Sequence, residues 1–190
     1  MTTPGACRLA IVWMLALPLL GARGEQASEG RTPASADAFP ADPRVNLATF
    51  TLNLTRFITW PKETFASPEA PFLIGTFPRD SINEYLDRAV RDELVEGHPV
   101  RTMRIRSLDD LAKCHLVYLS KNYASRPGVL ARVARRPVLA VSDANGFLER
   151  GGHVWFEVQA PQIAPHVSLE NLRTSGLGGR AQLLRLTAQP

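Results

Sequence analysis

Residues 114–143 decide the fold, and they read CHLVYLSKNYASRPGVLARVARRPVLAVSD. Two unbroken apolar runs, 116–119 and 137–141, flank the segment 127–134, in which Val129, Leu130 and Val133 recur at helical spacing. A short unbroken apolar run is typical of a strand buried on both faces, as in a parallel sheet. This stretch therefore predicts a strand, a helix and a second strand of an α/β sheet.

The same alternation extends toward the N-terminus. Apolar residues at three- and four-residue spacing predict a helix from residue 45 to Ile58 or Thr59, and Trp60-Pro61 ends it because a residue before proline disfavours helical angles. Residues 72–77 predict a short buried strand. A second helix is expected to begin near Asp80 or Ser81, since Ser81 and Glu84 fit the spacing of a capping box.

The remaining elements complete the prediction. Ser107 caps a helical turn, and a helix at 168–175 ends at Gly176. Further strands are expected at residues 100–106, 153–158, 165–169 and 182–186. The last three strands lack long crossovers, so that part of the sheet is expected to be antiparallel. The predicted class is a single α/β domain with a mostly parallel sheet, helices on both faces and an antiparallel C-terminal portion.

Length and composition bound the organisation. The 190 residues are 45% hydrophobic and 21% charged, with a net charge of +4, so they suit one globular domain and do not call for a nucleic-acid partner. Arg8 precedes the apolar run 9–20 and the small residues Gly21 and Ala22, which is the order of a cleavable signal peptide. We expect a signal peptide at 1–22, a flexible leader at 23–42 and the folded domain at 43–190.

Cysteine usage excludes an internal disulfide in the exported chain. Cys7 lies in the predicted signal peptide, which leaves only Cys114. Cys114 opens an apolar run, so we interpret it as a buried small hydrophobic residue.

The polar residues give no enzyme motif. In a doubly wound sheet, ligands bind at the carboxyl ends of the strands, which points to Ser120 and Asp143. A turn-capping role for Ser142-Asp143 is the alternative. The four histidines show no metal-binding spacing, no Gly-x-Ser-x-Gly elbow is present, and Gly176 fits a helix terminator better than a phosphate loop. We expect no catalytic residue, no metal and no cofactor.

Large aromatic residues beside loops are candidates for a binding surface. They are Trp60, Phe147 and one of Trp155 and Phe156. Strand alternation places Phe156 on one face of its strand and His153 and Trp155 on the other. Packing in the core is the alternative for each of these aromatic side chains.

Taken in order, several blocks resemble the YfiR-like periplasmic proteins over residues 45–187. The blocks are RFITWP (56–61), FLIG (72–75), CHLVYLS (114–120), PVLAVSDANGF (137–147), GGHVWF (151–156) and LLRL (183–186). The resemblance implies an exported α/β protein that is not an enzyme. It further implies binding to the sensor domain of an inner-membrane diguanylate cyclase or histidine kinase, release by an outer-membrane lipoprotein, and a homodimer as a further possibility.

The sequence departs from the best-known member of that family in two respects. That member carries two disulfides, whereas only Cys114 is available here, so redox control is not expected. His153 and Trp155 also follow the Gly-Gly block where relatives often carry other residues.

The leading hypothesis is a periplasmic regulator that represses or tunes a membrane signalling protein by contact. A periplasmic small-molecule-binding module is the alternative, and an enzyme with an unrecognised site is a third. The candidate partner or ligand contacts are Trp60, Ser120, Asp143, Phe147, His153 and Trp155.

Overall fold

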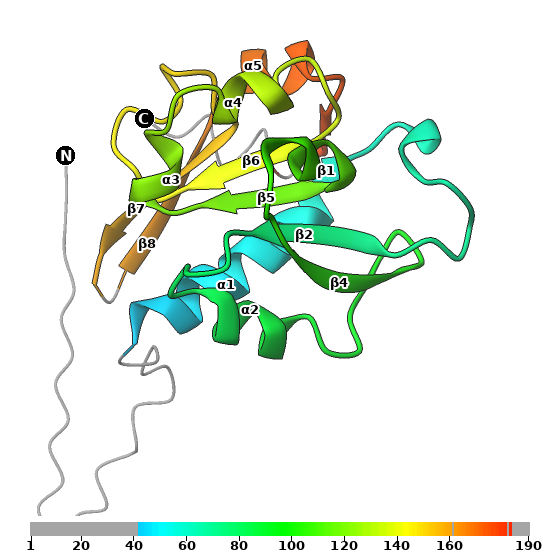
Figure 1. The fold of residues 1–190 in the computed structure, drawn as a ribbon, viewed down its shortest axis with the longest axis horizontal. Helices are drawn as coiled ribbons and strands as arrows, with labels where there is room; N and C mark the ends of the chain where they lie inside the picture. The colour runs from blue at the N-terminus through cyan, green and yellow to red at the C-terminus, as the bar shows by residue number, and fades with distance from the viewer. Residues whose placement is uncertain (1–41, 161, 182, 184–190) are drawn as a thin grey trace, which may run out of the picture. The chain divides into compact units, whose positions relative to one another are not determined.

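The computed structural model describes residues 42–160, 162–181 and 183 (Figure 1). They form a seven-stranded sheet in the order β3-β4-β2-β5-β6-β7-β8. Strands β4, β2, β5, β6 and β7 are parallel, and β3 and β8 pair antiparallel at the two edges. The strands are β2 (Phe72–Thr76), β3 (Leu94–Val95), β4 (His98–Arg104), β5 (Leu116–Leu119), β6 (Leu139–Ser142), β7 (Val154–Gln159) and β8 (Gln162–Val167). The predicted fold class is confirmed.

Helices cover both faces of the sheet (Figure 1). One face packs against α1 (Pro43–Leu54), α2 (Asn83–Ala89) and α5 (Leu169–Thr174), through a core that includes Leu52, Leu86 and Leu172. The other face packs against the 3-10 helix η3 (Leu108–Lys113), α3 (Lys121–Ala124) and α4 (Val129–Val133). All four residues of β5 are buried, because the strand sends side chains into both cores.

The order of the strands creates a switch point. The first parallel strand along the chain is β2. The next parallel strand, β4, lies on one side of β2, and the chain then crosses back so that β5 lies on the other side. Strands β6 and β7 continue outward from β5. Because connections run in opposite directions from β2 and β5, a crevice opens at their carboxyl ends, where doubly wound proteins bind ligands.

The first helix ends earlier than predicted. Asp42 caps α1 at its N-terminus, and α1 stops at Leu54 before the 3-10 turn η1 (Thr55–Phe57). Ile58 and Thr59 then form the short strand β1, which pairs antiparallel with β9 (Gly178–Gly179). This pairing with β9 explains why the helix does not continue to Ile58, although the apolar spacing in the sequence does.

The start of the second helix was also predicted wrongly. Ser81 caps nothing, and α2 begins at Asn83 after an uncapped Ile82. The side chains that order this turn are Asp80, whose Oδ1 accepts a hydrogen bond from the Ile82 amide, and Asn83, whose Nδ2 donates to the Phe77 carbonyl. In contrast, the predicted cap at Ser107 is present as a capping box with Asp110.

Some predictions fall outside the described residues. These are the signal peptide at 1–22, the leader at 23–42 apart from Asp42, and the strand at 182–186 apart from Leu183, which is helical. Gly176, at φ +74°, ends α5 as predicted. Cys114 is buried, with 3% of its surface exposed, which agrees with its interpretation as a core residue.

Candidate functional site

A crevice of about 550 Å³ lies at the switch point. Its lining comes from the segment that follows β2, from α3 after β5, and from Asp143 after β6. The fold therefore brings Ser120 and Asp143, two predicted contacts, together with Asp80, which the sequence indicated only as a helix start.

Asp80 is the most buried carboxylate of the crevice. It is 7% exposed, and its Oδ1 accepts one hydrogen bond from the Ile82 amide at 3.3 Å. Its Oδ2 is also buried, and Ser120 hydrogen-bonds to this carboxylate. Burial raises the pKa of Asp80, the nearby charge of Asp143 raises that pKa further, and Ser120 and the Ile82 amide oppose the rise.

Asp143 stands directly after β6, and its Oδ1 is likewise buried. The preceding Ser142 is fully buried, and its Oγ accepts a hydrogen bond from the Ala144 amide at 3.0 Å. Ser142 thus shapes the turn, as its turn-capping alternative predicted, and Asp143 faces the crevice. Burial raises the pKa of Tyr118 in β5, and the charges of Asp143 and Asp80 and a hydrogen bond to Asp143 add to that shift.

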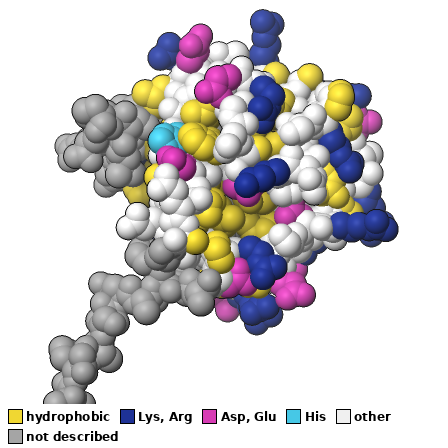
Figure 2. Space-filling model, turned by 90° about the vertical axis from the view of Figure 1, so that its left-hand side faces the viewer, with side chains coloured by type: hydrophobic (Ala, Val, Ile, Leu, Met, Phe, Trp, Pro, Cys, Tyr) yellow, Lys and Arg dark blue, Asp and Glu magenta, His cyan; other side chains and the backbone are white. Residues whose placement is uncertain are grey.

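Basic side chains surround these carboxylates. Arg79, Lys121 and Arg126 line the crevice, and none forms an ion pair with another described residue. The Arg126 guanidinium lies 4.4 Å from the centre of the Tyr123 ring, which in turn stacks on Phe77. Figure 2 views the molecule from the side on which α3 lies in Figure 1, and basic and acidic side chains are interspersed over that face.

Three predicted contacts are instead core residues. Trp60 is 3% exposed, Phe147 is fully buried and His153 is 1% exposed. The Phe147 ring fills the space beside Gly152, where a Cβ would overlap it. Their positions are those of core residues, and their role as partner or ligand contacts stays a prediction.

His153 is held by hydrogen bonds at both ring nitrogens. Nδ1 accepts from the Ala140 amide at 2.8 Å, so in the neutral ring Nε2 carries the proton and donates to Ser175 Oγ at 2.8 Å. Burial lowers the pKa of His153 to about 4. This side chain ties β6 to the end of α5 as a neutral group.

Trp155 remains half-exposed on the outer part of the sheet. Its ring stacks on His166 of β8, with centroids 4.8 Å apart, and His166 contacts Glu157 at 2.8 Å. The predicted alternation is confirmed, because Phe156 is fully buried in the opposite core.

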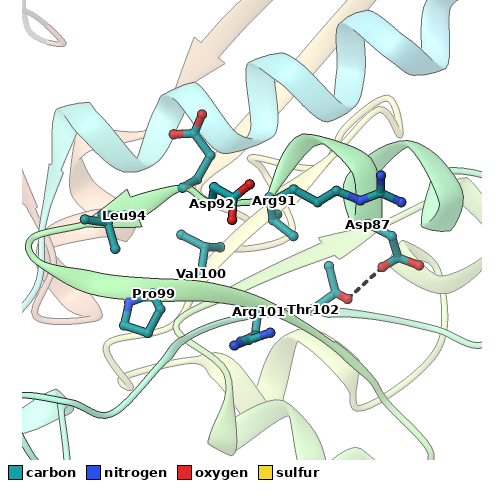
Figure 3. Close-up of a pocket in the computed structure, with 10 residues that line it drawn as sticks. Asp87, Arg91, Asp92, Leu94, Pro99, Val100, Arg101 and Thr102 are labelled. Atoms are coloured by element: carbon teal, nitrogen blue, oxygen red, sulfur yellow. Dashed lines mark hydrogen bonds between the residues drawn. The ribbon is translucent and has the colours of Figure 1, made fainter.

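A second hollow, of about 760 Å³, lies between α2 and β4 (Figure 3). Both oxygens of Asp87 are paired there: Oδ1 accepts from the Thr102 hydroxyl at 2.7 Å and Oδ2 from Arg104 at 2.6 Å. Asp87 is therefore satisfied within the protein.

The described residues hold no cluster of three or more acidic, histidine or cysteine side chains that would bind a metal ion. Within that same part of the chain, no helix combines the length and the apolar character needed to span a membrane.

The fold and the crevice define a doubly wound α/β domain with polar residues gathered at its switch point. The sequence profile of the YfiR/HmsC-like family matches residues 46–188, and the chain belongs to that family. The family is regulatory and non-catalytic, and in general periplasmic. No curated protein matches the chain.

Proposed function

We propose that this protein is a periplasmic regulator that binds an inner-membrane diguanylate cyclase or histidine kinase and represses or tunes its output. The family match over residues 46–188 carries the proposal, because it covers the chain from α1 through α5 and beyond. Family membership supports a role in cyclic-di-GMP signalling through a signalling partner. The signal peptide expected at 1–22 accords with export.

An apolar groove of about 400 Å³ is the surface we propose for partner contact. It lies between α1, η1 and β8, and its apolar lining includes Phe50, Phe57, Pro165 and Val167. Asn53 is an exposed polar residue at this groove. Grooves with aromatic lining are typical of protein contacts, in which a few buried aromatic residues supply most of the binding energy.

Capture from native cell envelopes tests the proposal. The full chain, with a C-terminal tag, would be expressed in its own host, crosslinked mildly and purified, and the captured proteins identified by mass spectrometry. We expect recovery of an inner-membrane cyclase or kinase, and lower output from that enzyme when purified protein is added to its membranes. An outer-membrane lipoprotein and a second copy of the chain are further expected captures.

Two matched variants connect the capture to the groove. Asn53→Arg adds a second guanidinium to the groove, which Arg56 already lines, without removing a core side chain, and we expect it to abolish capture of the signalling enzyme. Thr174→Arg makes the same kind of change at an exposed position of α5 and should leave capture unchanged. If the folded, exported bait recovers no membrane signalling protein, the proposed function is wrong.

A further inference from the structure

Charge is distributed unevenly between the two layers of helices. The segment 121–136, which forms α3 and α4, carries five basic residues and no acidic one. The segment 79–96, which forms α2 and β3, carries six acidic and three basic residues. Because α2 and α4 pack against opposite faces of the sheet, the domain has one side with excess positive charge and one with excess negative charge.

The positive charges of the segment 121–136 are available to an external anion. All five residues are exposed, and we call them the basic face: Lys121, Arg126, Arg132, Arg135 and Arg136. Arg132 pairs with Asp109 of η3 at 3.0 Å, and the other four form no ion pair with a described residue. The basic face therefore carries positive charge that the described part of the chain does not neutralise.

The basic face lacks the exposed apolar anchor that a protein partner would use. Among the described residues, the large hydrophobic side chain that is exposed is Leu94, and it lies in β3, outside the segment 121–136. A few buried aromatic or apolar residues supply most of the binding energy in protein interfaces. An anionic membrane, in contrast, attracts Lys and Arg through the charge of its lipid headgroups. The composition of this face therefore favours a lipid surface over a protein.

We propose that the basic face binds the headgroups of anionic phospholipids and holds the protein against a membrane surface. Each Lys or Arg near such a surface strengthens binding by about fivefold, so the five residues together give reversible, salt-sensitive attachment. The segment 79–96 is repelled by the same surface, which orients the domain with α2 away from the membrane. This assignment goes beyond the proposed partner binding and does not depend on it.

The proposed orientation leaves the apolar groove open. The groove lies between α1, η1 and β8, and α1 packs against the face of the sheet opposite to α3 and α4. A partner and a membrane can therefore occupy the two surfaces at the same time. Attachment to a membrane also raises the effective concentration of the protein near any partner in that membrane.

Cosedimentation with lipid vesicles tests the proposal without any partner protein. The protein, purified as it occurs in its own host, would be mixed with vesicles of equimolar phosphatidylglycerol and phosphatidylcholine, and with vesicles of phosphatidylcholine alone. We expect binding to the anionic vesicles only. Added salt should release the protein, because it shortens the screening length from about 8 Å at physiological ionic strength. Equal binding to the neutral vesicles would show insertion of an apolar segment and would overturn the proposal.

Two triple variants with the same change of net charge locate the binding. The first removes three unpaired charges of the basic face: Lys121→Gln/Arg126→Gln/Arg136→Gln. The control removes one lysine and two arginines that are exposed and unpaired elsewhere among the described residues: Lys62→Gln/Arg91→Gln/Arg173→Gln. The first variant should bind anionic vesicles about a hundredfold more weakly, and the control less than about fivefold more weakly. Equal weakening would show that net charge alone matters, and the proposal would be wrong.

Two further results would reject the lipid assignment. Salt-sensitive binding of poly-glutamate without binding of anionic vesicles would indicate an acidic protein as the partner of this face. Failure of the folded protein to bind anionic vesicles at low salt would reject the assignment as well. Asn53→Arg, which tests the groove, should bind vesicles like the wild type, so loss of partner capture and loss of lipid binding are distinguishable.

Discussion

The indole Nε1 of Trp60 donates a hydrogen bond to the backbone carbonyl of His115 across 3.2 Å. This contact joins the exit of β1 to the residue that precedes β5, 55 positions later in the chain. The Trp60 ring also packs edge-on against Phe72, with centroids 4.9 Å apart. Trp60 therefore connects the N-terminal segment to two central strands.

Replacement of Trp60 tests this structural role. Trp60→Ala should lower the free energy of unfolding by about 3 to 5 kcal/mol, as for other large buried aromatic residues. Trp60→Phe should cost only about 1 kcal/mol, since the His115 carbonyl also accepts a hydrogen bond from the Leu139 amide at 2.8 Å. Urea unfolding followed by circular dichroism measures both values. Unchanged stability of Trp60→Ala with lost partner capture would instead make Trp60 an interface residue.

Stability should fall as the pH decreases from about 6.5 to about 4 because of His153. Burial lowers the pKa of His153 to about 4 in the folded protein, below the 6.5 of an unperturbed histidine. The unfolded chain thus binds more protons than the folded protein in this window. The free energy of unfolding should therefore fall by about 3 kcal/mol between pH 6.5 and pH 4. Burial lowers the pKa of His115 in the same direction.

Urea unfolding at several pH values checks the histidine prediction. His153→Gln should be less stable than the wild type at neutral pH, because its hydrogen bonds to Ala140 and Ser175 are lost or weakened. Its stability should also depend less on pH between 4 and 6.5. An identical pH dependence in wild type and variant would show that His153 does not titrate in this way.

The central strands could be predicted because burial on both faces imposes an unbroken apolar run. Residues 116–119, predicted from that pattern, are the observed β5. The end of α1 could not be predicted, because Ile58 and Thr59 form a strand only by pairing with Gly178 and Gly179 from the far end of the domain.

The candidate site was predictable only in part for a similar reason. Asp143 follows an evident strand, and the rule for carboxyl ends places it at the sheet edge. Asp80 comes four residues after β2, and its position in the crevice depends on β5 lying beside β2, which the order along the chain does not decide. Burial of Trp60 and Phe147 likewise depends on tertiary packing that local pattern does not reveal.

Cys114 should be unreactive in the folded protein. It is 3% exposed, and burial raises its pKa to about 12, whereas the reactive species is the thiolate. With an unfolded thiol pKa near 8.5, the thiolate fraction at mildly alkaline pH falls roughly a thousandfold on folding. Labelling with a disulfide reagent should be rapid in urea and very slow in buffer. Equally fast labelling in both conditions would show that Cys114 is accessible.

Gly75 should tolerate a side chain only if Cys114 is reduced in size. A Cβ built at Gly75 would lie 2.5 Å from Cys114 Sγ and 3.0 Å from Ile105 Cδ1. The side chains just after β4 and just before β5 therefore pack closely against β2 at this point. Gly75→Ala should therefore destabilise the domain by about 1 to 3 kcal/mol through overpacking. In Gly75→Ala/Cys114→Ala the added methyl replaces the lost sulfur, and the double-mutant cycle should show a favourable coupling of about 1 kcal/mol or more. Additive effects of the two substitutions in urea unfolding would mean that the overlap is relieved elsewhere, by movement of Ile105 or of the strands.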